Sequence, residues 1–155
     1  MIQIEENKDY ALIQPLLEGV QNFHAELFPG VYKPFSNDDI RTEMQRYLSD
    51  PQCRIFVAQL NGDTIGYIMV LIKEIQENAF HYSYRIMHID QISVSKIHQK
   101  TGVGSMLMDK VEELAKELSI ARLELDHLHI NTKAATFFRS KTYMPYKEKL
   151  FKTLN

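Results

Sequence analysis

The sequence predicts an α/β (mixed α+β) domain in which helices pack on a central mixed sheet. The first observation is the order of the hydrophobic patterns, because strand-like runs of period two alternate with helix-like stripes of period 3.6. The second is size, since 155 residues, of which 45% are hydrophobic, suffice for one buried core. The third is that no repeat, low-complexity tract or linker divides the chain. We therefore expect residues 1–155 to form a single domain.

The first third of the chain predicts a short strand and two helices. The strand is expected at residues 2–4. Apolar residues then recur in steps of three and four from position 11 to position 27, and Pro15 is expected to kink this helix or to begin its second part. Ser36 and Asp39 resemble a capping box before a second apolar stripe at residues 40–48, which Pro51 ends.

The middle of the chain predicts a hairpin and a third, longer strand. The runs at residues 55–60 and 65–72 flank the pair Asn61-Gly62, which is typical of a tight antiparallel turn. The third strand is expected at residues 84–94. Because successive strand residues point to opposite faces, we expect one face to carry Ile86, His88, Asp90, Ile92 and Val94.

The last third alternates helices and strands. A helix is expected at residues 103–118 and a strand at residues 121–128. Asn131 is a suitable N-cap for a short helix that runs through Ser140. Two short strands, at residues 143–146 and 149–154, are expected to close the chain.

Charge and composition exclude several classes of function. The formal charge of −2 argues against broad binding of nucleic-acid phosphates, and the apolar runs are far shorter than the roughly 20 residues of a membrane span. The acidic start does not resemble a signal peptide, so we expect a cytoplasmic protein. Cys53, the single cysteine, excludes an internal disulfide and is expected to be a buried strand residue rather than a nucleophile.

The segment around Gly102 and Gly104 is the most informative part of the sequence. The two glycines lie between a predicted strand end and the first turn of an amphipathic helix. The first N–H groups of a helix lack intrahelical acceptors and carry the positive end of the helix dipole, and they therefore favour a phosphate. Lys96, His98 and Lys100 add local positive charge. This pattern indicates a site for a phosphate ester.

Two other phosphate-binding motifs fit the segment less well. A dinucleotide-binding fingerprint would use Glu124 for the ribose, but its third glycine would fall at Leu107. A Walker loop requires Lys followed by Ser or Thr after the second glycine, and this chain lacks that pair. A glycine-rich helix start without any ligand is the remaining alternative.

Two motifs carry a family resemblance. The segment Gln99-Lys100-Thr101-Gly102-Val103-Gly104 resembles the Q/R-x-x-G-x-G/A signature of the GNAT superfamily of acetyl-CoA-dependent N-acetyltransferases. The segment from Asn131 to Phe138 resembles the N-x-x-A-x-x-F-Y segment of the same family. The resemblance covers nearly the whole chain. It implies a mostly antiparallel mixed sheet that is splayed between its fourth and fifth strands and flanked by helices on both faces.

The resemblance also implies a set of binding residues for acetyl-CoA as co-substrate. The backbone of Ile92, Ser93 and Val94 would hold the pantetheine arm. Asn131 would lie near that arm or only cap its helix, and Phe138 would lie beside it. The diphosphate would be held by Gln99, Lys100, Thr101, Gly102, Val103, Gly104 and Ser105.

The implied reaction requires a base, because an alkyl ammonium with a pKa near 10.4 must lose a proton before its nitrogen can attack a thioester. Asp90 is our preferred candidate, and His88 lies two residues earlier. A structural role or attraction of a cationic acceptor is the alternative for each. Phe138 replaces the tyrosine with which many similar enzymes protonate the departing thiolate. This replacement leaves open a CoA-binding regulatory module that has lost catalysis.

The acceptor and further ligands are less clearly indicated. An amine acceptor is implied, namely a small amine, a polyamine or a peptide amine, and similar proteins often form homodimers. We expect no metal, although His127 and His129 alternate along a predicted strand, with Asp126 and Glu124 nearby. The first two helices and their connection would line the acceptor site, with His24, Glu26, Tyr32, Asp38, Asp39 and Glu43.

Overall fold

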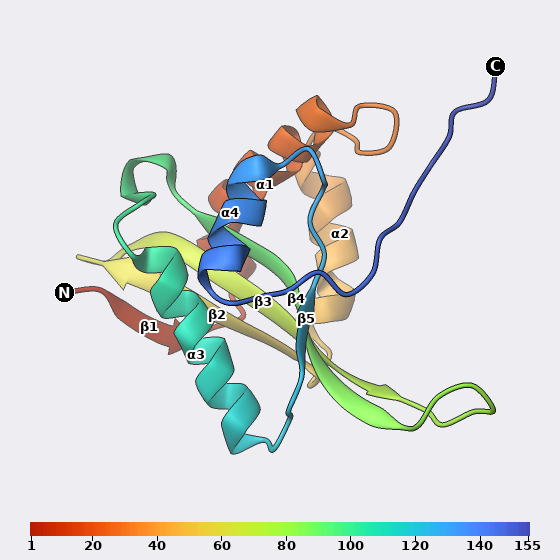
Figure 1. Ribbon diagram of the computed structural model, residues 1–155. Coiled ribbons are helices and arrows are strands. Elements are labelled where there is room, and N and C mark those ends of the chain that lie inside the picture. Colours follow the sequence, from red (N-terminus) through yellow and green to blue (C-terminus); the bar gives the residue numbers. More distant parts are fainter.

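The computed structural model describes residues 1–155 and contains one five-stranded sheet, in the order β1-β2-β3-β4-β5 (Figure 1). Neighbouring strands are antiparallel except β4 and β5, which are parallel. The mixed sheet predicted from the sequence is therefore confirmed. The strands are β1 (Gln3–Glu6), β2 (Cys53–Leu60), β3 (Asp63–Ile75), β4 (Tyr84–Val94) and β5 (Leu123–Leu125).

Helices cover both faces of the sheet. They are α1 (Tyr10–Leu27), α2 (Asn37–Leu48), α3 (Val103–Glu117) and α4 (Thr132–Ser140), with a short 3-10 turn, η1 (Lys96–His98), before α3. The apolar sides of α3 and α4 pack on one face, which we call the α3 face, and those of α1 and α2 pack on the other, the α1 face. Figure 1 shows α3 crossing the α3 face of the sheet. None of the helices is long and apolar enough to pass through a bilayer.

Two separate cores hold these layers together. On the α3 face, Leu107 and Val111 pack with Val70 and Met87. On the α1 face, fully buried side chains such as Ile13 and Tyr67 belong to a second cluster that includes Cys53. Burying one large apolar side chain contributes about 1.5–3 kcal/mol. The two clusters therefore fix the positions of the helices on the sheet.

Local sequence signals explain most of the elements. Asn61 and Gly62 both have positive φ, at 54° and 89°, and Leu60 pairs with Asp63, as a two-residue hairpin turn requires. The helix α1 continues through Pro15 without a break. The predicted capping box is wrong, because the Ser36 side chain makes no cap hydrogen bond.

The end of the chain differs from the prediction. The strands expected at residues 143–146 and 149–154 are absent, and no regular structure follows Ser140. A strand is stable only when it pairs with a neighbour, and β5, which has three residues instead of the eight expected at 121–128, offers only a short edge. Tyr143 does pack on the α3-face core, as its apolar character indicates.

A β-bulge in β4 changes the face of several predicted site residues. Met69 pairs with Gln91 but Val70 pairs with Ile89, so that Asp90 is the extra residue of the bulge. Met87 and Ile89 before the bulge, and Ile92 and Val94 after it, all pack on the α3 face. The prediction that His88 and Asp90 share a face with Ile92 and Val94 is therefore wrong, because His88 pairs with Leu71, which packs on the α1 face.

An ion pair between β1 and β2 gives a testable pH dependence. Arg54 donates two hydrogen bonds to the Glu6 carboxylate, and this contact lowers the pKa of Glu6 below its ordinary value of 4.5. A lowered folded-state pKa means that the stabilisation is complete above pH 4.5 and is lost as the pH falls through the folded-state value. We expect Glu6→Gln to lower the Tm by only about 1–2 °C at pH 7, because the pair is partly exposed, and by less at pH 3.

Thermal unfolding at the two pH values measures this effect. Glu77→Gln, in the exposed loop between β3 and β4, is the matched control, and it should leave the Tm unchanged at both. A Glu6→Gln deficit that is the same at pH 3 as at pH 7 would contradict the assignment of the effect to the ionised carboxylate.

Candidate active site

An opening in the sheet lies between β4 and β5. The two strands pair only at Met87 with Leu123, His88 with Glu124 and Ile89 with Leu125. From Asp90 to Val94, β4 continues with β3 as its single neighbour. The splayed fourth and fifth strands predicted from the sequence are thus confirmed, and the edge of β4 in this opening has no strand beside it.

The loop that follows β4 leads into the start of α3. The side-chain amide of Gln99 donates to the carbonyl of Val94 at 3.1 Å and so ties the loop to the strand end. The first intrahelical bond is donated by Met106 to the Gly102 carbonyl at 3.0 Å. The N–H groups of Val103, Gly104 and Ser105 consequently have no acceptor within the chain.

The two glycines of this loop have different physical roles. Gly102 has φ of +92°, which favours glycine, and a Cβ added to it would meet no atom within 4 Å. A Cβ on Gly104 would lie 3.2 Å from Cζ of Phe137, so this glycine allows α4 to pack on the start of α3. The open space at Gly102, the free N–H groups and the exposed Lys96 and Lys100 together fit a diphosphate group.

The Ser93 side chain faces α1 rather than the α3 face. Its Oγ donates to the carbonyl of Leu16 at 3.4 Å, which directs the hydroxyl towards α1 and away from the α3 face. Ile92 and Val94 have partly buried side chains on the α3-face core. The three predicted pantetheine residues thus offer the backbone of β4 at the opening.

The two candidate bases lie on the α1 face. Asp90 is exposed at the bulge. Tyr67 belongs to the α1-face core, and its pKa is raised by burial and also by the negative charge of Asp90. The Nε2 atom of His88 lies 3.9 Å from Oδ2 of Asp126, just beyond β5. The sequence reasoning missed this pairing, although the alternation of Glu124 and Asp126 along one strand face was its signal.

Cys53 is not activated as a nucleophile. It is fully buried on the α1 face, and burial raises its pKa to about 11, with the charges of Asp50 and Asp90 acting in the same direction against Lys8. A thiol with this pKa is almost entirely protonated at neutral pH. The expectation that it is a buried strand residue is confirmed.

Comparisons with known proteins identify the family. The model of the acetyltransferase (GNAT) family matches residues 17–141. Streptothricin acetyltransferase A of Bacillus subtilis (strain 168) is 30% identical over 128 residues, which cover 82% of this chain and 67% of that protein. The chain belongs to the GNAT acetyltransferase family. It is therefore an acyltransferase enzyme.

Solved structures show the same GNAT fold. A tetramutant of the BH1408 protein of Bacillus halodurans superposes with a TM-score of 0.90 and 16% identity, covering 98% of this chain and 99% of that chain. The aminoglycoside N-acetyltransferase AAC(6')-Iy in complex with CoA superposes with a TM-score of 0.70 and 17% identity, covering 99% of this chain and 95% of that chain. At these identities the likeness establishes the arrangement of helices and strands.

Asn131 and Phe138 of the second GNAT motif are placed by α4. The Asn131 side chain accepts from the N–H of Ala134 at 3.2 Å, so it caps α4. Phe138 is 7% exposed, and its ring lies 6.1 Å from the ring of His127 in a stacked arrangement. The structure thus gives Asn131 a capping role and makes Phe138 part of the core beside the opening.

Several predicted acceptor-site residues of this GNAT enzyme have structural partners. Asp38 and Asp39 lie in the first turn of α2, where carboxylates stabilise the helix dipole. Glu43 pairs with Arg46 at 2.5 Å, and the His24 ring lies 5.3 Å from that of Tyr32. No group of three potential metal ligands is present.

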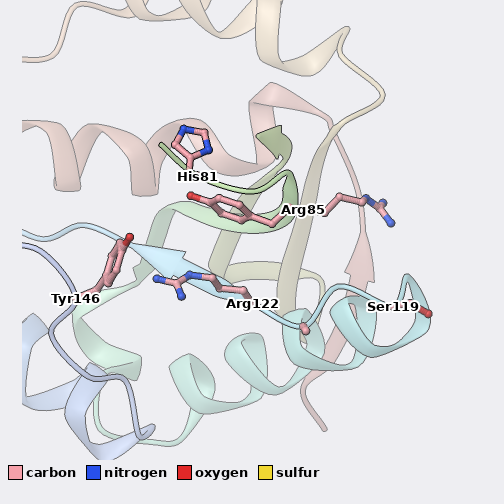
Figure 2. A pocket seen from close by; sticks show the side chains of 7 residues that line it. His81, Arg85, Ser119, Arg122 and Tyr146 are labelled. Carbon is pink, nitrogen blue, oxygen red and sulfur yellow. The ribbon is translucent and has the colours of Figure 1, made fainter. Parts of the chain in front are cut away.

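A separate cavity of about 600 Å³ lies away from the GNAT motifs, at the opposite end of β4 (Figure 2). It is lined by Tyr84, Arg85 and Arg122 among others. The guanidinium groups point in different directions in Figure 2, and each is already engaged, Arg85 with the Leu118 carbonyl and Arg122 with Glu124. The cavity therefore lacks convergent charges for an anion.

Gly66 of β3 supports the start of α3, and its substitution has a predictable effect. A Cβ at Gly66 would lie 3.1 Å from the Ser93 carbonyl oxygen and 3.1 Å from Cγ1 of Val103. Overpacking of this kind costs about 1–3 kcal/mol, so we expect Gly66→Ala to lower the Tm by about 3–9 °C.

Differential scanning calorimetry measures this change against Gly19→Ala in α1, where a Cβ meets nothing within 4 Å. The control should raise the Tm slightly, because glycine within a helix is destabilising. Equal changes in Tm for Gly66→Ala and Gly19→Ala would show that β3 and α3 are not in the close contact described.

Proposed function

We propose that this GNAT enzyme transfers the acetyl group of acetyl-CoA to a primary amine by direct attack in a ternary complex. One observation carries the proposal: the start of α3 has free N–H groups, and the preceding strand, β4, has an edge without a partner strand from Asp90 to Val94. The fold shared with an enzyme solved in complex with CoA supports it.

The binding roles follow from the local chemistry. The N–H groups of Val103, Gly104 and Ser105 hold the diphosphate, with Lys100 supplying charge beside Gly102. The backbone of Ile92, Ser93 and Val94 binds the pantetheine arm, because its edge in the opening has no partner strand. Gln99 keeps the loop close to the strand end through its bond to Val94.

The proposed base is Asp90, with His88 on the same face. The acceptor ammonium must lose its proton before attack, and Asp90 is exposed at the bulge beside the opening. His88 lies two residues earlier and is held near Asp126. The carboxylates of Asp90 and Asp126 also attract a cationic acceptor to this face.

The proposed acceptor class is a small amine that carries more than one positive charge. The exposed Asp90 and Asp126 favour such a molecule electrostatically. The curated relative is named for streptothricin, and several solved structures of the same fold are aminoglycoside acetyltransferases. Polyamines fit this class as well, and peptide amines are the alternative acceptor.

Two measurements test the proposal. Titration calorimetry with acetyl-CoA should give a saturable heat, and incubation with streptothricin, sisomicin, spermidine and a lysine peptide should release free thiol with at least one acceptor. No heat of binding would overturn the proposal. Binding without thiol release on any acceptor would favour the regulatory module instead.

A further inference from the structure

We propose that His127 is a catalytic residue of this enzyme, which donates a proton to the sulfur of CoA as the thioester bond breaks. The inference rests on the proposed function, and it concerns the second half of the reaction rather than the activation of the amine. Four observations carry it: the two-sided geometry of the opening, the position of His127, its hydrogen bonding and the lack of an available proton on Phe138 and Tyr143, whose rings pack nearby.

The two reactants approach the opening from opposite faces of the sheet. The start of α3, which holds the diphosphate, packs on the α3 face through Val103 and Leu107. The pantetheine arm is covalently joined to the diphosphate and so reaches the opening from that face. Asp90, the proposed base, is on the α1 face. The sulfur, which stays with the pantetheine arm, therefore departs on the α3 face, away from the base.

Asp126 and His127 lie on the two sides of this opening. Leu125 packs on the α3 face, and alternation along the chain directs Asp126 to the α1 face, where it contacts His88. His127 is directed to the α3 face, where its ring stacks on Phe138 with 6.1 Å between centroids and 24° between planes. Leu125 is the last residue that pairs with β4, so His127 lies where the strands separate.

The hydrogen bonding of His127 leaves one ring nitrogen available. Its Nδ1 lies 3.0 Å from the carbonyl oxygen of Leu128, and because a carbonyl only accepts, Nδ1 carries the proton of this bond. The side chain is exposed and no bond occupies Nε2. An imidazole held in this way carries a transferable proton at Nε2 in its charged form.

Neither Phe138 nor Tyr143, whose rings pack against each other on the α3 face, offers an available proton. Phe138 has no hydroxyl. The Tyr143 hydroxyl is buried without a partner, and burial together with the negative charge of Glu112 raises its pKa to about 12. His127, by contrast, is exposed beside the end of the β4–β5 pairing and has an unoccupied ring nitrogen.

The proton and electron balance of the step is complete. Asp90 takes one proton from the acceptor ammonium, and the nitrogen lone pair forms the C–N bond to the acetyl carbon. As the C–S bond breaks, its electron pair leaves with sulfur, which takes the Nε2 proton of His127. The amide nitrogen loses its second proton to water, Asp90 releases to solvent the proton that it took, and His127 takes a proton back from solvent. The net products are the acetylated amine, CoA thiol and one proton.

Two substitutions separate proton donation from ring stacking. His127→Phe keeps an aromatic ring on Phe138 but has no N–H, and His127→Ala removes the ring and leaves space for a small buffer acid. Acceptor turnover is followed as thiol release, acetyl-CoA affinity by calorimetry and folding by the Tm. Both variants should lose about 10- to 100-fold in kcat, with unchanged acetyl-CoA affinity. Added imidazole should restore turnover of His127→Ala in proportion to its concentration.

Other outcomes overturn the assignment. A kcat of His127→Phe within threefold of wild type shows that no proton from this residue is needed. A loss of kcat that follows a loss of affinity or Tm, or that imidazole does not restore in His127→Ala, shows a structural role. Wild-type protein that neither binds acetyl-CoA nor releases thiol fails the proposed function itself, and the assignment of His127 fails with it.

Discussion

Replacement of Gly102 by glutamate is expected to weaken acetyl-CoA binding by at least about 100-fold, which corresponds to about 2.7 kcal/mol. The added side chain enters the open space in front of the free N–H groups of Val103, Gly104 and Ser105. Its carboxylate occupies the position of the diphosphate and repels its charge. Titration calorimetry of the purified variant with acetyl-CoA measures the loss directly.

Gly62→Glu provides a matched control. Gly62 has φ of +89°, close to the +92° of Gly102, and a Cβ at either position meets nothing within 4 Å. Both substitutions therefore carry a similar backbone strain, about 1 kcal/mol, and should lower the Tm equally. Gly62 lies in the β2–β3 turn, so its variant should bind acetyl-CoA as wild type does. Equal affinities of the two variants would show that the diphosphate does not bind at the start of α3.

The features that the sequence predicted well are those encoded locally. Asn61 and Gly62 adopt positive φ with little strain, and they alone determine the β2–β3 turn. The apolar stripe of α3 and its glycine-rich start are likewise contained in one continuous segment. The binding loop from Gln99 to Ser105 was predictable for this reason, because strand end, loop and helix start are adjacent in the chain.

The features that the sequence did not predict depend on partners distant in the chain. The bulge at Asp90 results from the register between β3 and β4, and it reverses the face of every later residue in β4. The length of β5 is set by where β4 leaves it, at Ile89. The stacking of His127 on Phe138 joins the end of β5 to α4, and no local pattern indicates it.

The bulge has a consequence for the chemistry as well as for the fold. Without the extra residue, Asp90 would share a face with Ile92 and Val94, both of which pack with α3. The register shift leaves Asp90 exposed on the α1 face, while the strand beyond it keeps its apolar side chains packed, partly buried, on the α3 face. The proposed base therefore lies on one side of β4, and the side chains beneath the pantetheine arm lie on the other. This arrangement separates the removal of the amine proton from the departure of sulfur.

Asp90→Asn is expected to lower kcat about 100-fold at pH 7, because the acceptor ammonium then loses its proton only to water. The deficit should shrink as the pH rises towards 10, since an alkyl ammonium with a pKa near 10.4 deprotonates increasingly in solution. Asp90 is exposed, so the Tm should stay within about 2 °C of wild type. Initial rates of thiol release between pH 7 and pH 10, at saturating acetyl-CoA, measure the effect.

Asp126→Asn separates the loss of a base from the loss of a negative charge. The Asp126 side chain is 95% exposed and lies on the same face, so its removal weakens attraction of a cationic acceptor in a similar way. We expect a KM for the acceptor that rises a few-fold at pH 7, with kcat nearly unchanged at every pH between 7 and 10. If Asp90→Asn behaves in the same way as Asp126→Asn, then Asp90 only attracts the acceptor, and the proton must be taken by His88 or by water.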